Sequence, residues 1–256
     1  MINKKIRPID LPVVILCGGK GARMGPEELP KPMFTIGEHP ILWHIMKIYS
    51  YYGFNDFILA TGYRKEKINE FADKYSRIHK WNIRAVDTGL ETNTGGRIKK
   101  IQGYIKKDNF FVTYGDGLAD IDIKALLKYH LQRKAVGTLT AVRPTLPFGL
   151  LSYSVDTGRA TSFLEKPELS SVYGNDYWIN GGFFVFNKNV FDYIKENSIL
   201  ESDMLPMLAK EKKLFVYPHN GFWECMDTYK DNQKLNELWK SGKKPWAVWV
   251  EETEKK

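Results

Sequence analysis

The feature that most constrains the fold is an alternation of short apolar runs with helical patterns, from about residue 11 to residue 143. The first run, Val13-Val14-Ile15-Leu16-Cys17, is continuous and rich in β-branched residues, as expected of a strand buried on both faces. Helical patterns separate it from further strand patterns at residues 57–61, 83–88, 110–116 and 137–142. Because parallel strands are joined by helices that cover both faces of their sheet, the alternation predicts an α/β protein with a Rossmann-like, mainly parallel sheet.

The pattern changes after Arg143. Three β segments separated by turns are expected at residues 148–155, 161–166 and 178–186, and helices at 190–197 and 204–213. A last helix is expected from Thr228 to Ser241, ended by Gly242. Neither a linker nor an internal repeat separates the two parts. We therefore expect a single domain, residues 1–256, with a mainly parallel half at about 11–143 and a β-rich half with the C-terminal helix at about 144–256.

Composition excludes several classes of protein. The 38 lysine and arginine residues outnumber the 30 acidic ones, but they are spread along the chain, which does not favour a nucleic-acid partner. No apolar run reaches the roughly 20 residues that span a membrane, and the N-terminus lacks the apolar centre of a secretory signal. Two cysteines, Cys17 and Cys225, are too few for a disulfide framework or a four-cysteine zinc site. We expect a cytoplasmic enzyme without a nucleic-acid or membrane partner.

The first strand pattern leads directly into a glycine-rich segment at residues 16–23, with the sequence LCGGKGAR. Open α/β sheets bind ligands at this position, and glycines allow a phosphate to approach the backbone N–H groups closely. The segment does not match the dinucleotide fingerprint, which needs a small residue where Met24 stands and a helix that begins at once, and it lacks the Gly-Lys-Ser/Thr of a P-loop. A tight turn without a ligand remains the alternative for this loop alone.

Three more residues are candidates for phosphate chemistry. Lys31 lies between Pro30 and Pro32, which fix the backbone on either side of its ammonium group. Asp116 follows a buried strand pattern, where a carboxylate can hold a divalent cation over a phosphate. Asp227 is a second such acid, with a structural position before the last helix as the alternative. Asp122 is expected to be the N-cap of the helix that follows it.

Several motifs in order along the chain carry a specific resemblance. They are CGGKGARM, PKPM, TGGR, YGDG, EKP, INGGFFV and MDT. This arrangement resembles the nucleoside-diphosphate-sugar pyrophosphorylases, more properly nucleotidyltransferases, from about Val13 to Trp249. Within them, PILWHIMKIYS, GFWECMDTYKD and GKKPW are most similar to the glucose-1-phosphate cytidylyltransferases.

The resemblance implies a glycosyltransferase-A-like fold and the reaction of CTP with α-D-glucose 1-phosphate to give CDP-glucose and pyrophosphate, with Mg²⁺ as cofactor. It implies a homo-oligomer as well. The first half would then bind the nucleotide and the second half the sugar phosphate. The implied contacts of base, ribose and triphosphate are Leu16, Cys17, Gly18, Gly19, Lys20, Gly21, Ala22, Arg23, Lys31, Thr92, Arg97 and Gly115. The implied ligands of Mg²⁺ are Asp116 and Asp227. The implied sugar-phosphate residues are Glu165, Lys166, Asn180 and Gly181.

The catalytic candidates follow from the reaction. A sugar 1-phosphate is largely ionised at neutral pH, because its second pKa is about 6, so it needs no general base. Arg23 and Lys31 are expected to stabilise the leaving pyrophosphate, and Asp116 to hold the metal. Ala22 stands where the family usually has Thr, so one hydroxyl near the nucleotide is missing. The alternatives are another NTP or sugar 1-phosphate, a glycosyltransferase on the same core, and a catalytically silent subunit.

Overall fold

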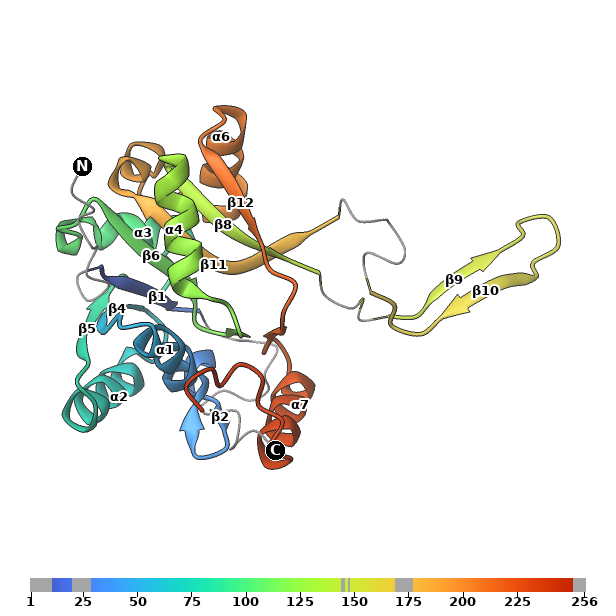
Figure 1. The fold of residues 1–256 in the computed structure, drawn as a ribbon, viewed down its shortest axis with the longest axis horizontal. Coiled ribbons are helices and arrows are strands. Elements are labelled where there is room, and N and C mark those ends of the chain that lie inside the picture. Colours follow the sequence, from blue (N-terminus) through green and yellow to red (C-terminus); the bar gives the residue numbers. More distant parts are fainter. Residues whose placement is uncertain (1–10, 20–28, 144–145, 147, 169–176, 251–256) are drawn as a thin grey trace.

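The computed structural model describes residues 11–19, 29–143, 146, 148–168 and 177–250. Its centre is a seven-stranded sheet with the strand order β12-β8-β11-β6-β1-β4-β5 (Figure 1). The bounds are β1 Val13–Cys17, β4 Asp56–Thr61, β5 Asn82–Asp87, β6 Asn109–Tyr114, β8 Gly137–Val142, β11 Ile179–Asn187 and β12 Leu214–Pro218. Only β11 runs antiparallel to its neighbours in this sheet. The predicted α/β class with a mainly parallel sheet is confirmed.

Both faces of the sheet are covered, which explains why the first strand is apolar throughout. Val13, Ile15 and Cys17 pack into one hydrophobic core, and Val14 and Leu16 pack into the other. The first core is shared with helices α1 (Ile41–Tyr51), α2 (Lys65–Ile78) and α4 (Ile123–Arg133), together with α7 (Tyr229–Lys240). The second is shared with α3 (Thr94–Lys100) and α6 (Leu205–Lys210). Alternate residues of one strand therefore face different helical layers.

Several helix boundaries lie where the sequence predicts them. The Asp122 side chain accepts a hydrogen bond from the Ala125 N–H at 2.9 Å, which is the predicted N-cap of α4. Thr228 caps α7 in a reciprocal arrangement with Asp231, and Gly242 follows the helix with a positive φ of 78°.

The helix expected at residues 190–197 is not an α-helix. The chain there forms a short 3-10 helix, η5 (Lys188–Tyr193), followed by an irregular segment. This segment is held against α3, because the Gly96 N–H donates to the Ser198 carbonyl at 3.0 Å. The helix expected at residues 204–213 is observed as α6 (Leu205–Lys210). It is preceded by the one-turn π-helix η6 (Leu200–Met204). Tertiary contact with α3 has here overridden the local helical pattern.

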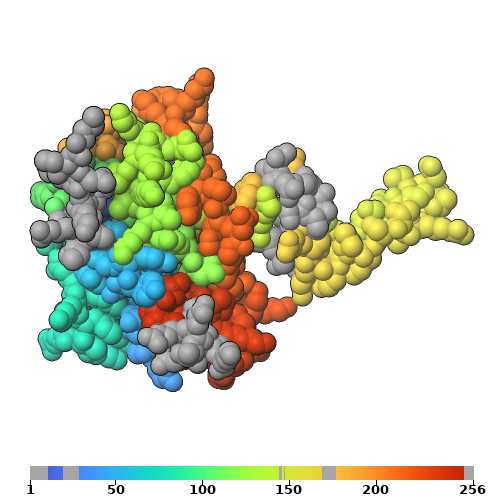
Figure 2. Space-filling view, in the orientation of Figure 1, coloured from blue at the N-terminus to red at the C-terminus, as the bar shows by residue number. Residues whose placement is uncertain are grey.

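The β-rich half contributes to the central sheet and also forms an arm. Strand β11 inserts between β6 and β8, so both halves of the chain share one sheet. Strands β9 (Leu150–Tyr153) and β10 (Ala160–Leu164) pair only with each other and extend away from the sheet (Figure 1). The space-filling view shows this hairpin, in yellow, projecting from the body of the molecule (Figure 2). We call residues 148–168 the arm.

Short elements complete the description. The 3-10 helices η3 (Lys31–Met33) and η4 (Gln102–Tyr104) lie outside the central sheet. Two small ladders pair β2 (Thr35–Ile36) with β3 (His39–Pro40), and β7 (Gly117–Ala119) with β13 (Trp223–Cys225). Within the ranges given above, no helix is both long and apolar enough to cross a membrane.

Candidate active site

A cavity of about 620 Å³ lies at the carboxyl ends of β1 and β6, where open α/β sheets bind their ligands. The amino end of the antiparallel strand β11 reaches the same edge of the sheet. The cavity is lined by Leu16, Gly18, Gly19, Lys31, Pro32, Thr92, Asn93, Thr94, Arg97, Tyr114, Gly115, Asp116, Gly117, Asn180, Gly181, Gly182, Glu201, Trp223, Cys225 and Asp227. Most of the residues predicted for substrate and metal therefore meet at one place.

Lys31, Asp116 and Asp227 form a cluster in this cavity. The Lys31 Nζ donates to Asp116 Oδ2 at 2.6 Å and to Asp227 Oδ1 at 2.7 Å. The lysine side chain is only 13% exposed. Burial disfavours its charge, but the charge of Asp116 and the hydrogen bonds to both carboxylates outweigh burial and raise the pKa of Lys31. The ammonium is therefore charged at neutral pH.

Close backbone packing brings the three side chains together. A Cβ on Gly115 would lie 2.8 Å from Pro32 Cγ and 2.9 Å from the Leu16 carbonyl oxygen, so only glycine lets η3 approach the end of β6. The Met226 N–H donates to the Asp116 carbonyl at 2.9 Å and extends the β7–β13 pairing. Asp116 and Asp227 thus lie side by side although they are far apart in sequence.

The cluster fits a divalent cation. One position lies within 2.7 Å of oxygens from both carboxylates, and in this structure the Lys31 ammonium takes it. Carboxylate oxygens are the ligands that Mg²⁺ prefers, and it is commonly bound by one or two of them together with substrate phosphates. No group of three or more His, Cys, Asp or Glu side chains suited to a metal occurs within the described ranges.

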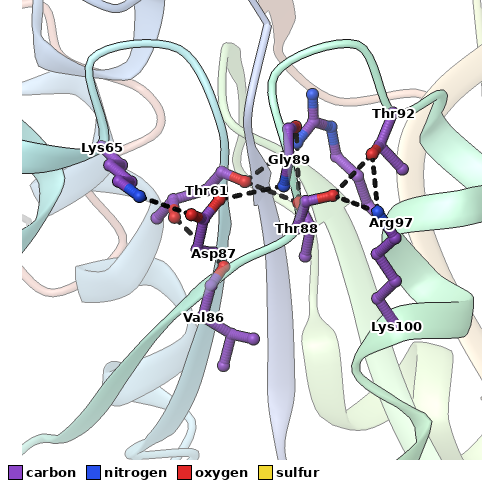
Figure 3. Close-up of polar contacts among 9 residues, drawn as sticks. All are labelled: Thr61, Lys65, Val86, Asp87, Thr88, Gly89, Thr92, Arg97 and Lys100. Atoms are coloured by element: carbon purple, nitrogen blue, oxygen red, sulfur yellow. Dashed lines mark hydrogen bonds and ion pairs between the residues drawn. The ribbon is translucent and has the colours of Figure 1, made fainter.

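Arg97 lines the cavity, as expected of a substrate contact, and its guanidinium is also bound to the protein itself. It is 5% exposed, and its two terminal nitrogens donate to five oxygens of the protein. The acceptors are the Thr61, Gly89, Gly18 and Leu90 carbonyls and the Thr88 hydroxyl, at 2.6–3.2 Å. Figure 3 shows the guanidinium beside Thr61, Thr88 and Gly89. Arg97 therefore fastens the loop after β1 to the turn after β5, and its predicted contact with nucleotide stays a prediction.

Desolvation also acts on Arg97 and its neighbours. Burial lowers the pKa of Arg97 from its usual value, yet the group remains strongly basic. A Cβ on Gly18 would collide with the guanidinium, so glycine is required there by close approach. The hydroxyl of Thr92 donates to the Thr88 carbonyl at 2.5 Å and accepts from Lys100 at 3.0 Å (Figure 3). The polar groups of this wall are held in place by one another.

Other predicted residues lie away from the cavity. The Cys17 side chain is buried in the first core, and burial raises the pKa of its thiol. Glu165 and Lys166 lie at the end of the arm nearest the body, with exposed side chains, and do not line the cavity. Lys20, Gly21, Ala22 and Arg23 lie outside the described residues. The cavity thus contains part of the predicted set.

The structure adds cavity residues that sequence reasoning missed. They are Pro32, Asn93, Thr94, Tyr114, Gly117, Gly182, Glu201, Trp223 and Cys225. Most adjoin a motif and could have been found by extending it by one or two positions. Glu201 could not, because it lies in the π-helix η6, where the sequence carries no motif, and it reaches the cavity only through tertiary packing.

Burial and a neighbouring charge also set the protonation state of the Cys225 thiol. It lies beside the cluster, and burial, followed by the charge of Asp116, raises its pKa to about 12. The thiol is therefore protonated at neutral pH and does not act as a nucleophile. The fold and the cavity together define an α/β protein with an ammonium group and two carboxylates at the edge of the sheet where ligands bind.

Comparison with known proteins identifies the family. Residues 12–240 match the Nucleotidyl transferase family. The chain is 42% identical to a probable glucose-1-phosphate cytidylyltransferase of Bacillus subtilis, over 92% of this chain and 99% of that protein. It is also 42% identical to the glucose-1-phosphate cytidylyltransferase of Salmonella typhi, over 92% and 98%. The chain belongs to the nucleotidyl transferase family and is a nucleotidyltransferase.

Solved structures show the same fold. The crystal structure of HddC from Yersinia pseudotuberculosis, complexed with GMP-PN, is similar with a TM-score of 0.68 and 24% identity, over 90% of this chain and 99% of that one. A putative glucose-1-phosphate thymidylyltransferase from Bacillus anthracis has a TM-score of 0.66 and 18% identity, over 94% and 96%. At these identities the likeness supports the fold alone.

Proposed function

We propose that this enzyme transfers a cytidylyl group from CTP to α-D-glucose 1-phosphate, giving CDP-glucose and pyrophosphate. The observation that carries the proposal is the 42% identity, over 92% of the chain, to proteins named glucose-1-phosphate cytidylyltransferase. The Lys31–Asp116–Asp227 cluster supports it, because two phosphate-bearing substrates require cations where they meet. The same reaction with another NTP or another sugar 1-phosphate is the alternative.

We propose that the predicted site residues form two sets, one for each substrate, and that Glu165 and Lys166 of the second set act from the arm, outside the cavity lining. The nucleotide side comprises the loop after β1, including Lys20, Gly21, Ala22 and Arg23, with Lys31, Thr92, Arg97 and Gly115. The sugar-phosphate side comprises Asn180 and Gly181 at the start of β11, with Glu165 and Lys166 from the arm.

The reaction is a direct displacement. An ionised oxygen of the sugar phosphate attacks the α-phosphorus, forming the new P–O bond while the bond from the α-phosphorus to the bridging oxygen breaks. Pyrophosphate leaves with that electron pair, so no covalent enzyme intermediate forms and no side chain takes a proton. Lys31 and Arg23 stabilise the charge on the leaving group, and Lys166 aligns the monoester for in-line attack.

We propose Mg²⁺ as the divalent cation, held by Asp116 and Asp227. When bound, it supplies Lewis-acid stabilisation of charge on the phosphate oxygens. The Lys31 ammonium then exchanges its two carboxylate partners for phosphate oxygens. The enzyme's own residues hold the cation and neutralise the substrates.

Substrate choice is the first experiment. Pyrophosphate release is measured from each of the four NTPs with a panel of sugar 1-phosphates. We expect CTP with glucose 1-phosphate to give a kcat/KM at least about tenfold above any other pair. A different preferred pair would change the assigned substrates but not the class of reaction. Transfer of the sugar from a nucleotide sugar to an acceptor would instead indicate a glycosyltransferase.

The cluster is tested by substitution. We expect Lys31→Ala, Asp116→Asn and Asp227→Asn each to lower kcat by at least about 10²–10³-fold, because each removes charge stabilisation in the transition state. Since the two carboxylates act as a unit, the double Asn variant is expected to be little worse than either single one. Lys188→Ala is the matched control, because that lysine pairs with Asp108 at 2.6 Å on the surface. Additive losses, or full activity in EDTA, would contradict a shared cation site.

We also propose that the protein acts in the cytoplasm, where its nucleotide substrate is made. We further propose that it forms a homo-oligomer. Large apolar side chains on the arm are exposed, Val155 at 82%, Phe148 at 77% and Phe163 at 64%. An isolated two-stranded hairpin is marginally stable in water, and exposed apolar patches of this kind are typical of interfaces. A second copy of the chain is the proposed cover, and light scattering measures the oligomeric state.

A further inference from the structure

Glu201 is the centre of a chain of hydrogen bonds that crosses the cavity. One carboxylate oxygen accepts from the Thr94 hydroxyl at 2.8 Å, and the other accepts from the Tyr114 hydroxyl. Tyr114 in turn accepts from the Asn180 side-chain N–H at 3.2 Å, and the Asn180 side-chain oxygen accepts from the Gly182 N–H at 2.9 Å. The chain therefore joins the start of α3 to the start of β11 through a carboxylate.

The backbone around Glu201 is built to place it there. A Cβ on Gly95 would lie 2.7 Å from the Ser198 carbonyl oxygen, and Gly96 donates its N–H to that same oxygen at 3.0 Å. The Leu200 N–H donates to the Thr94 hydroxyl at 2.9 Å, which fixes the residue directly before Glu201. The two glycines of the TGGR motif thus allow the stretch before η6 to dock on α3. This packing, rather than contact with a ligand, explains those glycines.

The Tyr114 ring is fixed as firmly as its hydroxyl. Burial, followed by the hydrogen bond and charge of Glu201, raises the pKa of Tyr114. The hydroxyl therefore stays protonated and donates a hydrogen bond to Glu201. A Cβ on Gly182, whose φ is +79°, would lie 2.6 Å from Tyr114 Cδ2, so the ring packs directly on the β11 backbone. Tyr114 therefore holds Glu201 and Asn180 at a set spacing.

Unused hydrogen-bonding capacity faces the cavity. Within the described residues, each carboxylate oxygen of Glu201 accepts one hydrogen bond and keeps a second lone pair, and the Asn180 side chain keeps a second N–H. Glu201 is exposed to solvent and lines the cavity, so a ligand can reach it. An acceptor and a donor at fixed spacing match the hydroxyl groups of a sugar, which act as donors and acceptors, and do not match a phosphate, which a carboxylate repels.

We propose that Glu201 is a specificity-determining residue that accepts hydrogen bonds from ring hydroxyls of the sugar 1-phosphate, with Tyr114 as its positioning residue. The inference rests on the proposed function, since it concerns the second substrate of that reaction. A site built to bind a hydroxyl discriminates against analogues that lack it, because its polar groups are then left unpaired. Glu201 is thereby assigned to selection of the sugar rather than to the chemical step.

The test compares glucose 1-phosphate with its 2-, 3-, 4- and 6-deoxy analogues. For the wild-type enzyme we expect at least one analogue to lose about 10–100-fold in kcat/KM, the size of a hydrogen bond to a charged group. In Glu201→Ala we expect that ratio to fall to within about threefold of unity, mainly through KM, while kcat changes little. Calorimetric titration of CTP should give an affinity within about twofold of wild type.

Two further variants keep the result interpretable. Glu201→Gln preserves volume and remains informative if the Ala variant unfolds, and Tyr114→Phe should lower discrimination in the same direction by a smaller factor. Glu196→Gln is the matched control, an exposed glutamate of the same stretch that does not line the cavity. Unchanged deoxy-sugar ratios in an active Glu201→Ala enzyme would overturn the proposal, and so would a collapse of CTP affinity, which would assign Glu201 to the ribose. Inactivity of the wild-type enzyme with CTP and glucose 1-phosphate would instead overturn the proposed function.

Discussion

Two regions of the molecule, helix α3 beside the cavity and the arm, each carry a basic residue in a recognisable motif. The surroundings of these two residues are opposite. Arg97 of TGGR is 5% exposed and donates to five protein oxygens. Lys166 of EKP has a side chain that is 51% exposed, and its ion pair with the neighbouring Glu165 spans 3.5 Å. Arg97 therefore has its partners within the folded chain, whereas Lys166 has room for one from outside.

The difference follows from where each residue lies in the fold. Arg97 follows two glycines on a helix that packs against the central sheet, so backbone carbonyls surround it on several sides. Lys166 lies on a hairpin that pairs with no other strand, and its φ of +43° is unusual for a residue with a side chain. A charged residue in a motif can thus stabilise the fold or bind the substrate. The exposed fraction of its side chain and the number of its partners within the protein distinguish the two cases.

The largest expected effect is on Arg97. Arg97→Gln removes a buried charge and leaves several carbonyls without a donor, so we expect the free energy of unfolding to fall by about 3–5 kcal/mol. Urea denaturation followed by circular dichroism measures it. Arg77→Gln, at an exposed arginine on α2, is the control and should change stability by less than about 0.5 kcal/mol. A stable Arg97→Gln protein with lost CTP binding would show that the guanidinium serves the nucleotide alone and not the framework.

Lys166 should behave in the opposite way. We expect Lys166→Ala to leave stability within about 0.5 kcal/mol of wild type and to lower kcat/KM for glucose 1-phosphate by about 10–100-fold, because the phosphate loses a charge-assisted partner. Calorimetric affinity for CTP should stay nearly the same, and Lys128→Ala on the exposed face of α4 is the control. Loss of CTP affinity with preserved use of sugar phosphate would place Lys166 on the nucleotide side.

The third prediction concerns the exposed apolar face of the arm. Leu151 and Phe163 are a cross-strand pair with exposed side chains, and changing both to Ser should dissociate the oligomer while altering the unfolding of the body by less than about 1 kcal/mol. The control changes the neighbouring pair, Ser152 and Ser162, to Ala. Light scattering gives the mass of each variant. An unchanged oligomer would mean that the arm face is not the interface.

The sequence by itself determined the class of fold and many element boundaries, because these depend on local patterns. Continuous apolar strands and helical periodicity predicted the mainly parallel sheet, and Asp122 and Gly242 predicted their helix ends. The motifs also identified Lys31, Asp116 and Asp227 as candidates, because each stands beside a strand end, a proline pair or a helix start.

Only the tertiary structure decided how those residues act together. Lys31 donates to acids 85 and 196 positions away, a contact that depends on strand order and on the close approach allowed by Gly115. No local pattern indicated Glu201, since docking of its segment on two glycines of α3 places it in the cavity. Likewise the family resemblance implied a nucleotide contact for Arg97, and only packing shows that its guanidinium also has five partners in the protein. Periodicity is a property of neighbours along the chain, whereas a site is made where distant segments meet.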